Sequence, residues 1–192
     1  MNGYLSVDIE TTGIHNNAHV LQIAAVYDDL KSPISELLKF DVAVKYTVMT
    51  HCEPYAMGMN AKLLEKLMDK DYGLDPKFAS SSFISFLNKV HEHIGHKDEK
   101  GRATKIVFAG KNVASFDIPK IRTFLTENDR HAFDSIIHYK TLDVGSLYYD
   151  VFKDNVSLSK INELTNRPAV SHNALDDAFD VVYAVRHKLG IK

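Results

Sequence analysis

Apolar and polar residues alternate along the first third of the chain in the manner of β-strands. Apolar residues occupy positions 5, 7 and 9, an apolar run extends from Val20 to Tyr27, and positions 40, 42, 44 and 46 alternate again. Gly13 separates the first two segments, and Ser32-Pro33 separates the second from the third. We therefore expect three strands joined by short antiparallel connections.

The middle of the chain changes to helical spacing. Residues 47–60 contain Pro54 and Gly58, and we expect them to form an ordered loop. From Ala61 to Met68 and from Phe78 to His93 the apolar residues recur every three or four positions, which predicts two helices. Residues 97–103 form a charged, exposed turn between this part and the next.

Strands and helices alternate over the last half of the chain. We expect a buried strand at 106–109, a helix that begins near Asp117, a strand at 139–142, a helix at 158–164 and a last helix at 174–189. A three-stranded meander followed by this alternation predicts an α/β fold with a mixed sheet, first antiparallel and then parallel, flanked by helices. The RNase H-like fold, with five strands, has this order.

Composition narrows the class of protein. The 192 residues are 45% hydrophobic and 25% charged, which favours one folded domain over residues 1–192. The single cysteine, Cys52, fits a reducing compartment, and neither a secretory signal at residues 1–4 nor a membrane-spanning run is visible, so we expect a cytoplasmic protein. A net charge of −2 argues against the neutralisation of long duplexes, so any contact with nucleic acid should be short and local.

Two carboxylates share one face of the first strand. Asp8 and Glu10 are two positions apart, so both point away from the face that carries the apolar residues. The separation is roughly 6.6 Å. Two carboxylates at this distance can hold a pair of metal ions about 3.5–4 Å apart. A polar, solvent-facing side of the strand would give the same pattern.

Further polar side chains follow the predicted strand at 106–109. Asp117 lies where this strand gives way to a helix, and taken alone it fits an N-cap. Asn112 and Phe116 add an amide and an aromatic ring near the strand's exit, where open α/β sheets place their ligands. Phe116 could equally belong to the core.

The last helix contains three aspartates, and its periodicity distinguishes between them. At about 100° per residue, Asp177 lies at the edge of the apolar stripe, whereas Asp176 and Asp180 fall on the polar side. A carboxylate turned toward an apolar interface requires a cation or hydrogen-bond donors. Asp177 is therefore expected to face the sheet, with His172 placed by the turn before the helix.

Three segments together resemble the motifs of the DEDDh exonucleases. They are residues 8–13 (Asp-Ile-Glu-Thr-Thr-Gly), 112–117 (Asn-Val-Ala-Ser-Phe-Asp) and 172–177 (His-Asn-Ala-Leu-Asp-Asp). The family includes the proofreading subunit of bacterial replicative polymerase, RNase T and oligoribonuclease. The motifs extend over nearly the whole chain, and His172, in place of the tyrosine of the sister DEDDy group, indicates the subclass.

The resemblance implies a role for each motif residue. Asp8, Glu10 and Asp177 would bind two metal ions, Asp117 would complete the acidic cluster, and His172 would be the general base. Magnesium or manganese suits such a set of oxygen ligands better than zinc does. A histidine can accept a proton from water near neutral pH.

The resemblance also implies contacts with the terminal nucleotide. In the family, the residues after the first motif hold this nucleotide, and a later loop, here residues 54–60, touches the last base. The expected substrate-binding residues are Thr11, Thr12, Gly13, Ile14, Met59, Asn60, Asn112 and Phe116.

Several other residues could suggest a site but fit an ordinary structural role at least as well. His91, His93 and His96 could suggest a metal site, but only the last two share a helical face. Cys52 has no histidine partner that suggests a thiol nucleophile, so we expect a buried or inert thiol. Basic residues around the second motif could meet phosphate, although scattered surface charge explains them equally well; they are Lys111, Lys120 and Arg122.

The sequence thus predicts a metal-dependent 3′-to-5′ exonuclease that acts on single-stranded 3′ ends, with DNA ahead of RNA, and releases nucleoside 5′-monophosphates. An oligoribonuclease-like, RNA-trimming activity is one alternative, because the motifs do not separate DNA from RNA. A catalytically silent module that binds strand ends is a second alternative. The family leaves open a polymerase or another replication partner, and the sequence does not define the oligomeric state.

Overall fold

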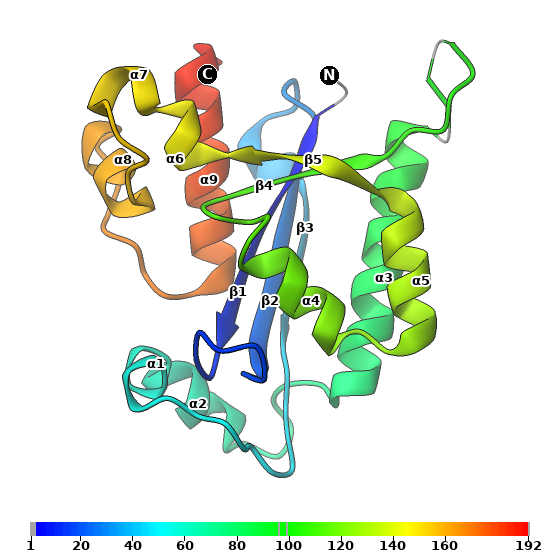
Figure 1. The fold of residues 1–192 in the computed structure, drawn as a ribbon, viewed down its shortest axis with the longest axis vertical. Coiled ribbons are helices and arrows are strands. Elements are labelled where there is room, and N and C mark those ends of the chain that lie inside the picture. Colours follow the sequence, from blue (N-terminus) through cyan, green and yellow to red (C-terminus); the bar gives the residue numbers. More distant parts are fainter. Residues whose placement is uncertain (1–2, 96, 99, 192) are drawn as a thin grey trace.

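A five-stranded mixed sheet forms the centre of the fold, in the order β3-β2-β1-β4-β5 (Figure 1). The computed structural model describes residues 3–95, 97–98 and 100–191. β1 (Tyr4–Thr11) pairs antiparallel with β2 (Val20–Asp28), which pairs antiparallel with β3 (Leu38–Ala43). β4 (Ile106–Gly110) runs parallel to both β1 and β5 (Ile137–Asp143). The expected meander followed by parallel strands is confirmed.

Helices cover both faces of the sheet (Figure 1). The side chains of Leu5, Val7 and Ile9 pack in one core cluster with residues of α3 (Pro76–Ile94) and α5 (Glu127–Ile136). The other face of β1 lies against α9 (Ala174–Leu189), where Ser6 Oγ donates a hydrogen bond of 2.7 Å to the Ala178 carbonyl oxygen. The face of β1 that carries Asp8 and Glu10 is therefore covered by α9 and does not face open solvent.

The remaining helices are short. They are η1 (Ile34–Glu36, a 3-10 helix), α1 (Pro54–Met59), α2 (Ala61–Leu67), α4 (Asp117–Phe124), α6 (Val144–Leu147), α7 (Tyr149–Phe152) and α8 (Leu158–Leu164). In Figure 1, α1 and α2 lie near the end of the sheet at which β1 finishes.

Several elements differ from the sequence-based expectation. Residues 54–59 form α1 and not a loop, because Pro54 sits at the first helical position, where its fixed φ favours a helix. The third strand ends at Ala43, and Val44 forms an isolated bridge with Leu74. The helix α5 was not predicted, since only Phe133 and Ile136 among its residues are buried and the apolar pattern is weak.

A buried ion pair joins the end of β2 to the last part of α9, and Tyr4 at the start of β1 adds a hydrogen bond to it. The Tyr4 hydroxyl donates to Asp28 Oδ2 at 2.8 Å, and Arg186 Nη2 lies 2.6 Å from Asp28 Oδ1. Arg186 also donates to the Ser32 carbonyl oxygen at 2.8 Å. The first strand therefore begins, and the last helix ends, at the same end of the sheet.

Three sequence-based expectations include residues outside the described ranges, and one of these residues is Glu99 of the expected charged turn at 97–103. Met1 and Asn2 belong to the segment in which no secretory signal was visible, and His96 belongs to the rejected metal site. Within the described residues, no helix combines the length and apolar character that a membrane span requires.

Candidate active site

Asp8 and Glu10 lie near the end of β1, on the side that faces α9. Asp8 is half-buried and Glu10 is buried. Glu10 lies opposite Gln22 of β2, and Gln22 Oε1 accepts a hydrogen bond of 3.3 Å from the backbone N–H of Ala174. The first turn of α9 is thereby held against the part of the sheet that carries both carboxylates.

Asp177 faces the sheet from the first turn of α9, as the helical phase predicted. Its side chain is buried, whereas that of Asp176 is exposed. The expectation that Asp180 lies on the polar side is wrong: it is 5% exposed and accepts hydrogen bonds from Arg167 Nε at 2.7 Å and Asn162 Nδ2 at 2.5 Å. These partners come from α8 and the following loop, which cover the side of α9 that helical periodicity alone predicted to be polar and exposed.

Asp117 enters the cluster from the first turn of α4. It does not act as the N-cap, because Phe116 occupies that position without a side-chain hydrogen bond. The Asp117 carboxylate is buried and accepts hydrogen bonds from its own backbone and from that of Ile9, between the two carboxylates of β1. Gly110 allows the close approach of β4 to β1, since a Cβ atom there would lie 3.0 Å from the Val7 carbonyl oxygen.

Burial raises the pKa values of all four carboxyl groups, and other carboxylates of the cluster add to this effect at Asp8, Glu10 and Asp117. Burial, followed by Asp117, Asp177 and Glu10, holds the pKa of Asp8 well above its usual range. Burial raises the pKa of Glu10 to about 7 and that of Asp177 to about 6. Burial also raises the pKa of Asp117 to about 8, against hydrogen bonds that lower it. This concentration of negative charge favours a cation.

His172 lies beside two of these carboxylates. Among the described residues, one ligand atom each from Glu10, His172 and Asp177 lie within 4.8 Å of one another, and His172 is exposed. Its backbone has a φ of 55°, in the left-handed region that non-glycine residues seldom adopt. The chain therefore bends sharply at His172, directly before α9.

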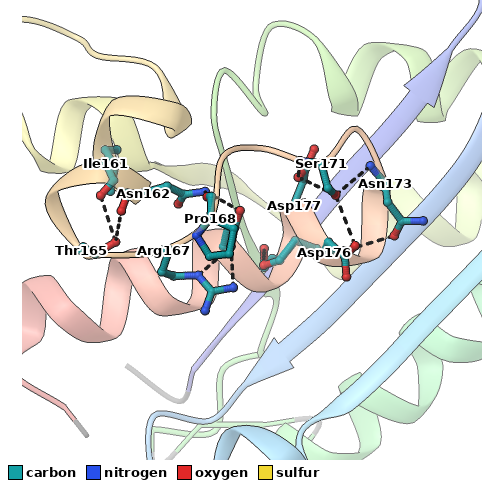
Figure 2. Close-up of polar contacts among 12 residues, drawn as sticks. Ile161, Asn162, Thr165, Arg167, Pro168, Ser171, Asn173, Asp176 and Asp177 are labelled. Atoms are coloured by element: carbon teal, nitrogen blue, oxygen red, sulfur yellow. Dashed lines mark hydrogen bonds and ion pairs between the residues drawn. The ribbon is translucent and has the colours of Figure 1, made fainter. Parts of the chain in front are cut away.

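Ser171 connects this bend to α9, a link that the sequence did not reveal. Figure 2 shows Ser171 between Asp177 and Asn173. The Ser171 backbone N–H donates to Asp177 Oδ1 at 3.1 Å, and its hydroxyl donates to Asp176 Oδ2 at 3.2 Å. The Asn173 side chain caps α9 by accepting hydrogen bonds from the two backbone N–H groups of residues 175 and 176.

The predicted substrate-binding residues after β1 form a tight loop. The hydroxyl groups of both threonines already have acceptors within the protein. Thr11 donates to the Gly13 carbonyl oxygen at 2.8 Å, and Thr12 donates to the His51 carbonyl oxygen, in the segment before α1, at 3.1 Å. The Ile14 side chain is 77% exposed. Of these residues, Ile14 offers the largest exposed side chain for a contact with substrate.

The Glu53 side chain lies against this loop, and no pattern in the sequence indicated that contact. Its Oε1 atom accepts hydrogen bonds from the backbone N–H groups of Ile14 at 3.1 Å and His15 at 3.3 Å. A Cβ atom at Gly13 would lie 2.7 Å from the Glu53 carboxyl carbon, so the glycine makes room for the side chain. Two of the amides closest to the first motif are therefore already bound to a carboxylate.

The other predicted contacts lie at different depths. Asn60 is buried and donates from Nδ2 to the Thr11 carbonyl oxygen at 3.1 Å, so it supports the end of β1. Met59 is exposed. Asn112 is exposed with a φ of 58°, and its backbone N–H donates to Asp143 Oδ2 at 2.7 Å. Phe116 is half-buried.

The basic residues around the second motif have distinct environments. Lys120 is not scattered surface charge: it is 6% exposed and lies beside Asp117. Arg122 pairs with Asp134 at 2.8 Å, and Lys111 donates hydrogen bonds to Asn112 and Asn155.

The histidines of the rejected metal site and the single cysteine lie in ordinary structural environments. The His91 ring lies 3.0 Å from the Thr104 carbonyl oxygen, whereas the His93 ring packs edge-on against Tyr27. Cys52 is exposed, in the segment before α1, so of the expected buried or inert thiol only the inert one stays a prediction.

The sheet and its flanking helices have the RNase H-like fold that is found in exonucleases. E. coli exonuclease I in complex with a dA16 oligonucleotide aligns with a TM-score of 0.64 at 17% identity, over 97% of this chain and 41% of its own. Cell-death related nuclease 4 (CRN-4) aligns with a TM-score of 0.63 at 13% identity, over 99% of this chain and 64% of its own. A zinc-bound complex of E. coli exonuclease I with ssDNA aligns with a TM-score of 0.65 at 14% identity, over 97% of this chain and 41% of its own.

Sequence comparisons add no family to this likeness. No protein-family model matches the sequence, and no curated protein matches it. The chain spans 41% of the length of exonuclease I, so the likeness concerns the fold of that part.

Proposed function

We propose that this protein is a metal-dependent 3′-to-5′ exonuclease of the DEDDh type, which removes nucleoside 5′-monophosphates from single-stranded nucleic acid. The observation that carries the proposal is the convergence of four buried or half-buried carboxylates and one exposed histidine at the end of β1. These residues come from three distant segments of the chain. A protein that only binds strand ends has no chemical need for this combination, which argues against the silent-module alternative.

The donor set fits divalent metal ions. Asp8, Glu10, Asp117 and Asp177 supply oxygen ligands, and such ligands suit magnesium or manganese. The raised pKa values of these groups show that the folded chain opposes their charge, which a bound cation would relieve. One related structure is a zinc-bound form of exonuclease I, and His172 adds a nitrogen donor that zinc also accepts.

The proposal gives each of these residues a task in phosphodiester hydrolysis. Two divalent ions, when bound, activate the attacking water and stabilise the departing 3′ oxygen. The four carboxylates would hold the ions, and Ser171 fixes one oxygen of Asp177 by its backbone N–H. His172 would accept one proton of the attacking water as the bond from the water oxygen to phosphorus forms. The bond from phosphorus to the 3′ oxygen breaks, this oxygen takes a proton from solvent to become the new 3′-hydroxyl group, and a nucleoside 5′-monophosphate is released.

DNA is the favoured substrate because exonuclease I was solved with dA16 and dT13 oligonucleotides. Discrimination between DNA and RNA depends on contacts with the 2′-hydroxyl group. An RNA-trimming activity is therefore the alternative substrate choice for the same site. A polymerase partner and a cytoplasmic location are consistent with the proposal and are not required by it.

A product ladder tests polarity, sugar preference and activity together. Single strands labelled at the 5′ end would be incubated with magnesium, as DNA and as RNA, each with a free or a blocked 3′ end. We expect stepwise shortening of the unblocked DNA strand and release of 5′-monophosphates. Shortening of the blocked strand would contradict 3′-to-5′ polarity, and intact strands in every reaction would refute the proposed activity.

A further inference from the structure

A cavity of about 330 Å³ adjoins the candidate active site. It lies between the loop after β1, the start of α3 and the second half of α4, and its walls include Asn17, His19, Tyr46, Lys120 and Phe124. Ligand pockets in proteins begin at about this volume, near 300 Å³. None of the roles assigned above uses this space.

Lys120 forms the boundary between the cavity and the acidic cluster. Burial lowers the pKa of its ammonium group, and the nearby carboxylates of Glu53 and Asp117 offset part of that effect. It donates a hydrogen bond of 2.8 Å to the His15 carbonyl oxygen and lies 5.0 Å from the centre of the Phe116 ring. An ammonium group has three donors, so this side chain keeps capacity for an anionic acceptor.

An aromatic pair forms another part of the wall. The rings of His19 and Tyr46 have their centres 4.6 Å apart, and His19 Nε2 accepts the backbone N–H of Thr50 at 3.1 Å. Exposed Asn16 and Asn17 bring amide groups to the rim, and each amide can both donate and accept a hydrogen bond. Aromatic rings with nearby amides are the groups that proteins use to stack and to recognise nucleobases.

We propose that this cavity binds one nucleotide unit, with its base against His19 and Tyr46 and its phosphate on the Lys120 ammonium group. The nucleotide can come from two sources, the substrate strand or the released monophosphate. Both have the same chemistry, a planar base joined to a phosphate. The assignment of the source rests on the proposed exonuclease function, whereas the binding site itself does not.

Binding is tested first without metal, because the acidic cluster then repels phosphate. In EDTA, dAMP would be titrated into the wild-type protein, Asn17→Asp, Lys120→Met and the control Asn128→Asp, with calorimetry and chemical shifts as readouts. Asn17 and Asn128 are both exposed, so neither substitution threatens the core. Loss of a charge-assisted hydrogen bond in Lys120→Met predicts roughly tenfold weaker binding or more. Asn17→Asp should also weaken binding, and Asn128→Asp should match the wild type.

Hydrolysis with magnesium then identifies the source. If the cavity holds a nucleotide of the strand, Asn17→Asp raises KM for oligomers and leaves kcat unchanged. If it holds the product, Asn17→Asp leaves KM unchanged and weakens inhibition by dAMP. Failure of dAMP to bind the wild type in EDTA, or equal affinities of Asn17→Asp and Asn128→Asp, would overturn the site. An inactive wild type that still binds dAMP would refute the proposed function alone.

Discussion

Each carboxyl group of the acidic cluster becomes charged at an energetic cost in the folded chain. Burial raises the pKa values of Glu10 and Asp177 to about 7 and 6, above the usual range of such carboxyl groups. Carboxylates of functional sites are often buried close together, where their charged form is unfavourable until a cation binds. Removal of one charge should therefore affect activity and stability in opposite directions.

Asp8→Asn should reduce hydrolysis roughly a thousandfold or more, because it removes one ligand of a group of residues that acts as a unit. The same variant should unfold at a higher temperature than the wild type in EDTA at pH 8, since asparagine removes a carboxyl group whose charge burial and the neighbouring carboxylates oppose. Circular dichroism would confirm the fold before activity is measured. A folded Asp8→Asn protein with full activity would exclude the two-metal arrangement.

The two neighbouring aspartates of α9 offer a matched comparison. Asp177→Asn should inactivate the enzyme, whereas Asp176→Asn should change turnover by less than about threefold, since an amide oxygen can still accept the Ser171 hydroxyl. Single-turnover rates of both variants would be compared with the wild type. Equal losses would show that Asp176, through Ser171, matters as much as the carboxylate that faces the sheet.

His172→Ala should lower turnover by roughly a hundred- to ten-thousandfold, the range for loss of a general base. Single-turnover rates measure this loss, and the four carboxylates that would hold the metal ions remain in the variant. Calorimetric titration with magnesium should show binding close to that of the wild type. Loss of metal affinity as complete as in Asp8→Asn would make His172 a ligand and not the base.

The sequence predicted those site residues whose orientation follows from local periodicity. Asp8 and Glu10 share a strand face, and Asp177 shares the stripe that packs on the sheet, so period and phase were enough. Glu53 and Lys120 could not be found in this way. Their surroundings depend on where the loop after β1 folds back, and the partner of Glu53 lies 39 residues away in the chain.

At the scale of elements, α8 and α9 are joined by a polar network beside the loop that carries His172. Arg167 donates to Asp180 at 2.7 Å, and its guanidinium group lies 3.7 Å from the centre of the Tyr183 ring. Asn162 donates to the Pro168 carbonyl oxygen at 3.1 Å, and Figure 2 shows Asn162, Arg167 and Pro168 together at the end of α8. The network fixes the loop at its start, and Ser171 fixes it at its end.

Arg167→Leu should lower the free energy of unfolding by about 2 kcal/mol, less than the 3–5 kcal/mol found when one partner of a fully buried pair is removed. The smaller value is expected because the Arg167 side chain is 26% exposed, although Asp180 would lose its cation. Urea denaturation measures this change. The double variant Arg167→Leu/Asp180→Leu should recover part of the loss, and a double variant less stable than Arg167→Leu would contradict the argument.

Elements with regular apolar spacing were predicted more reliably than elements without it, as the seven-residue helices α2 and α8, which were predicted, and the ten-residue helix α5, which was not, both show. The strands and the helices α3 and α9 have regular apolar positions over many residues, so their existence followed from pattern. α6 and α7 each have four residues, and no periodicity can develop over so short a span. Asp180 was misplaced because α8, which covers it, packs against α9 only in the folded chain.

For the whole molecule, the acidic cluster makes stability depend on pH in an unusual direction. The folded pKa values of Glu10 and Asp177 lie above their unfolded values, so the folded state binds more protons between about pH 4 and 7. The contribution of these groups to stability is therefore present at low pH and is lost as pH rises through about 6 and 7. Metal ions, which bind the deprotonated groups, act in the opposite direction.

We expect the melting temperature of Glu10→Gln, measured in EDTA, to exceed that of the wild type by an amount that grows from pH 5 to pH 8. Magnesium should raise the melting temperature of the wild type, by an increment that also grows with pH, because protons compete for the same oxygens. At a concentration 100 times Kd, the increment corresponds to about 2.7 kcal/mol. A wild-type increment that is equal at pH 5 and pH 8 would contradict this linkage.

The ion pair of Asp28 with Arg186 has a consequence for handling the protein. It places the beginning of β1 and the end of α9 together, at the end of the sheet remote from Glu10 and Asp177 (Figure 1). A tag or surface linker attached beside Tyr4 or Leu189 would leave the candidate active site facing away from its support. If the protein has the proposed exonuclease activity, the immobilised form should therefore degrade long strands as readily as the free form, whichever of the two ends carries the tether.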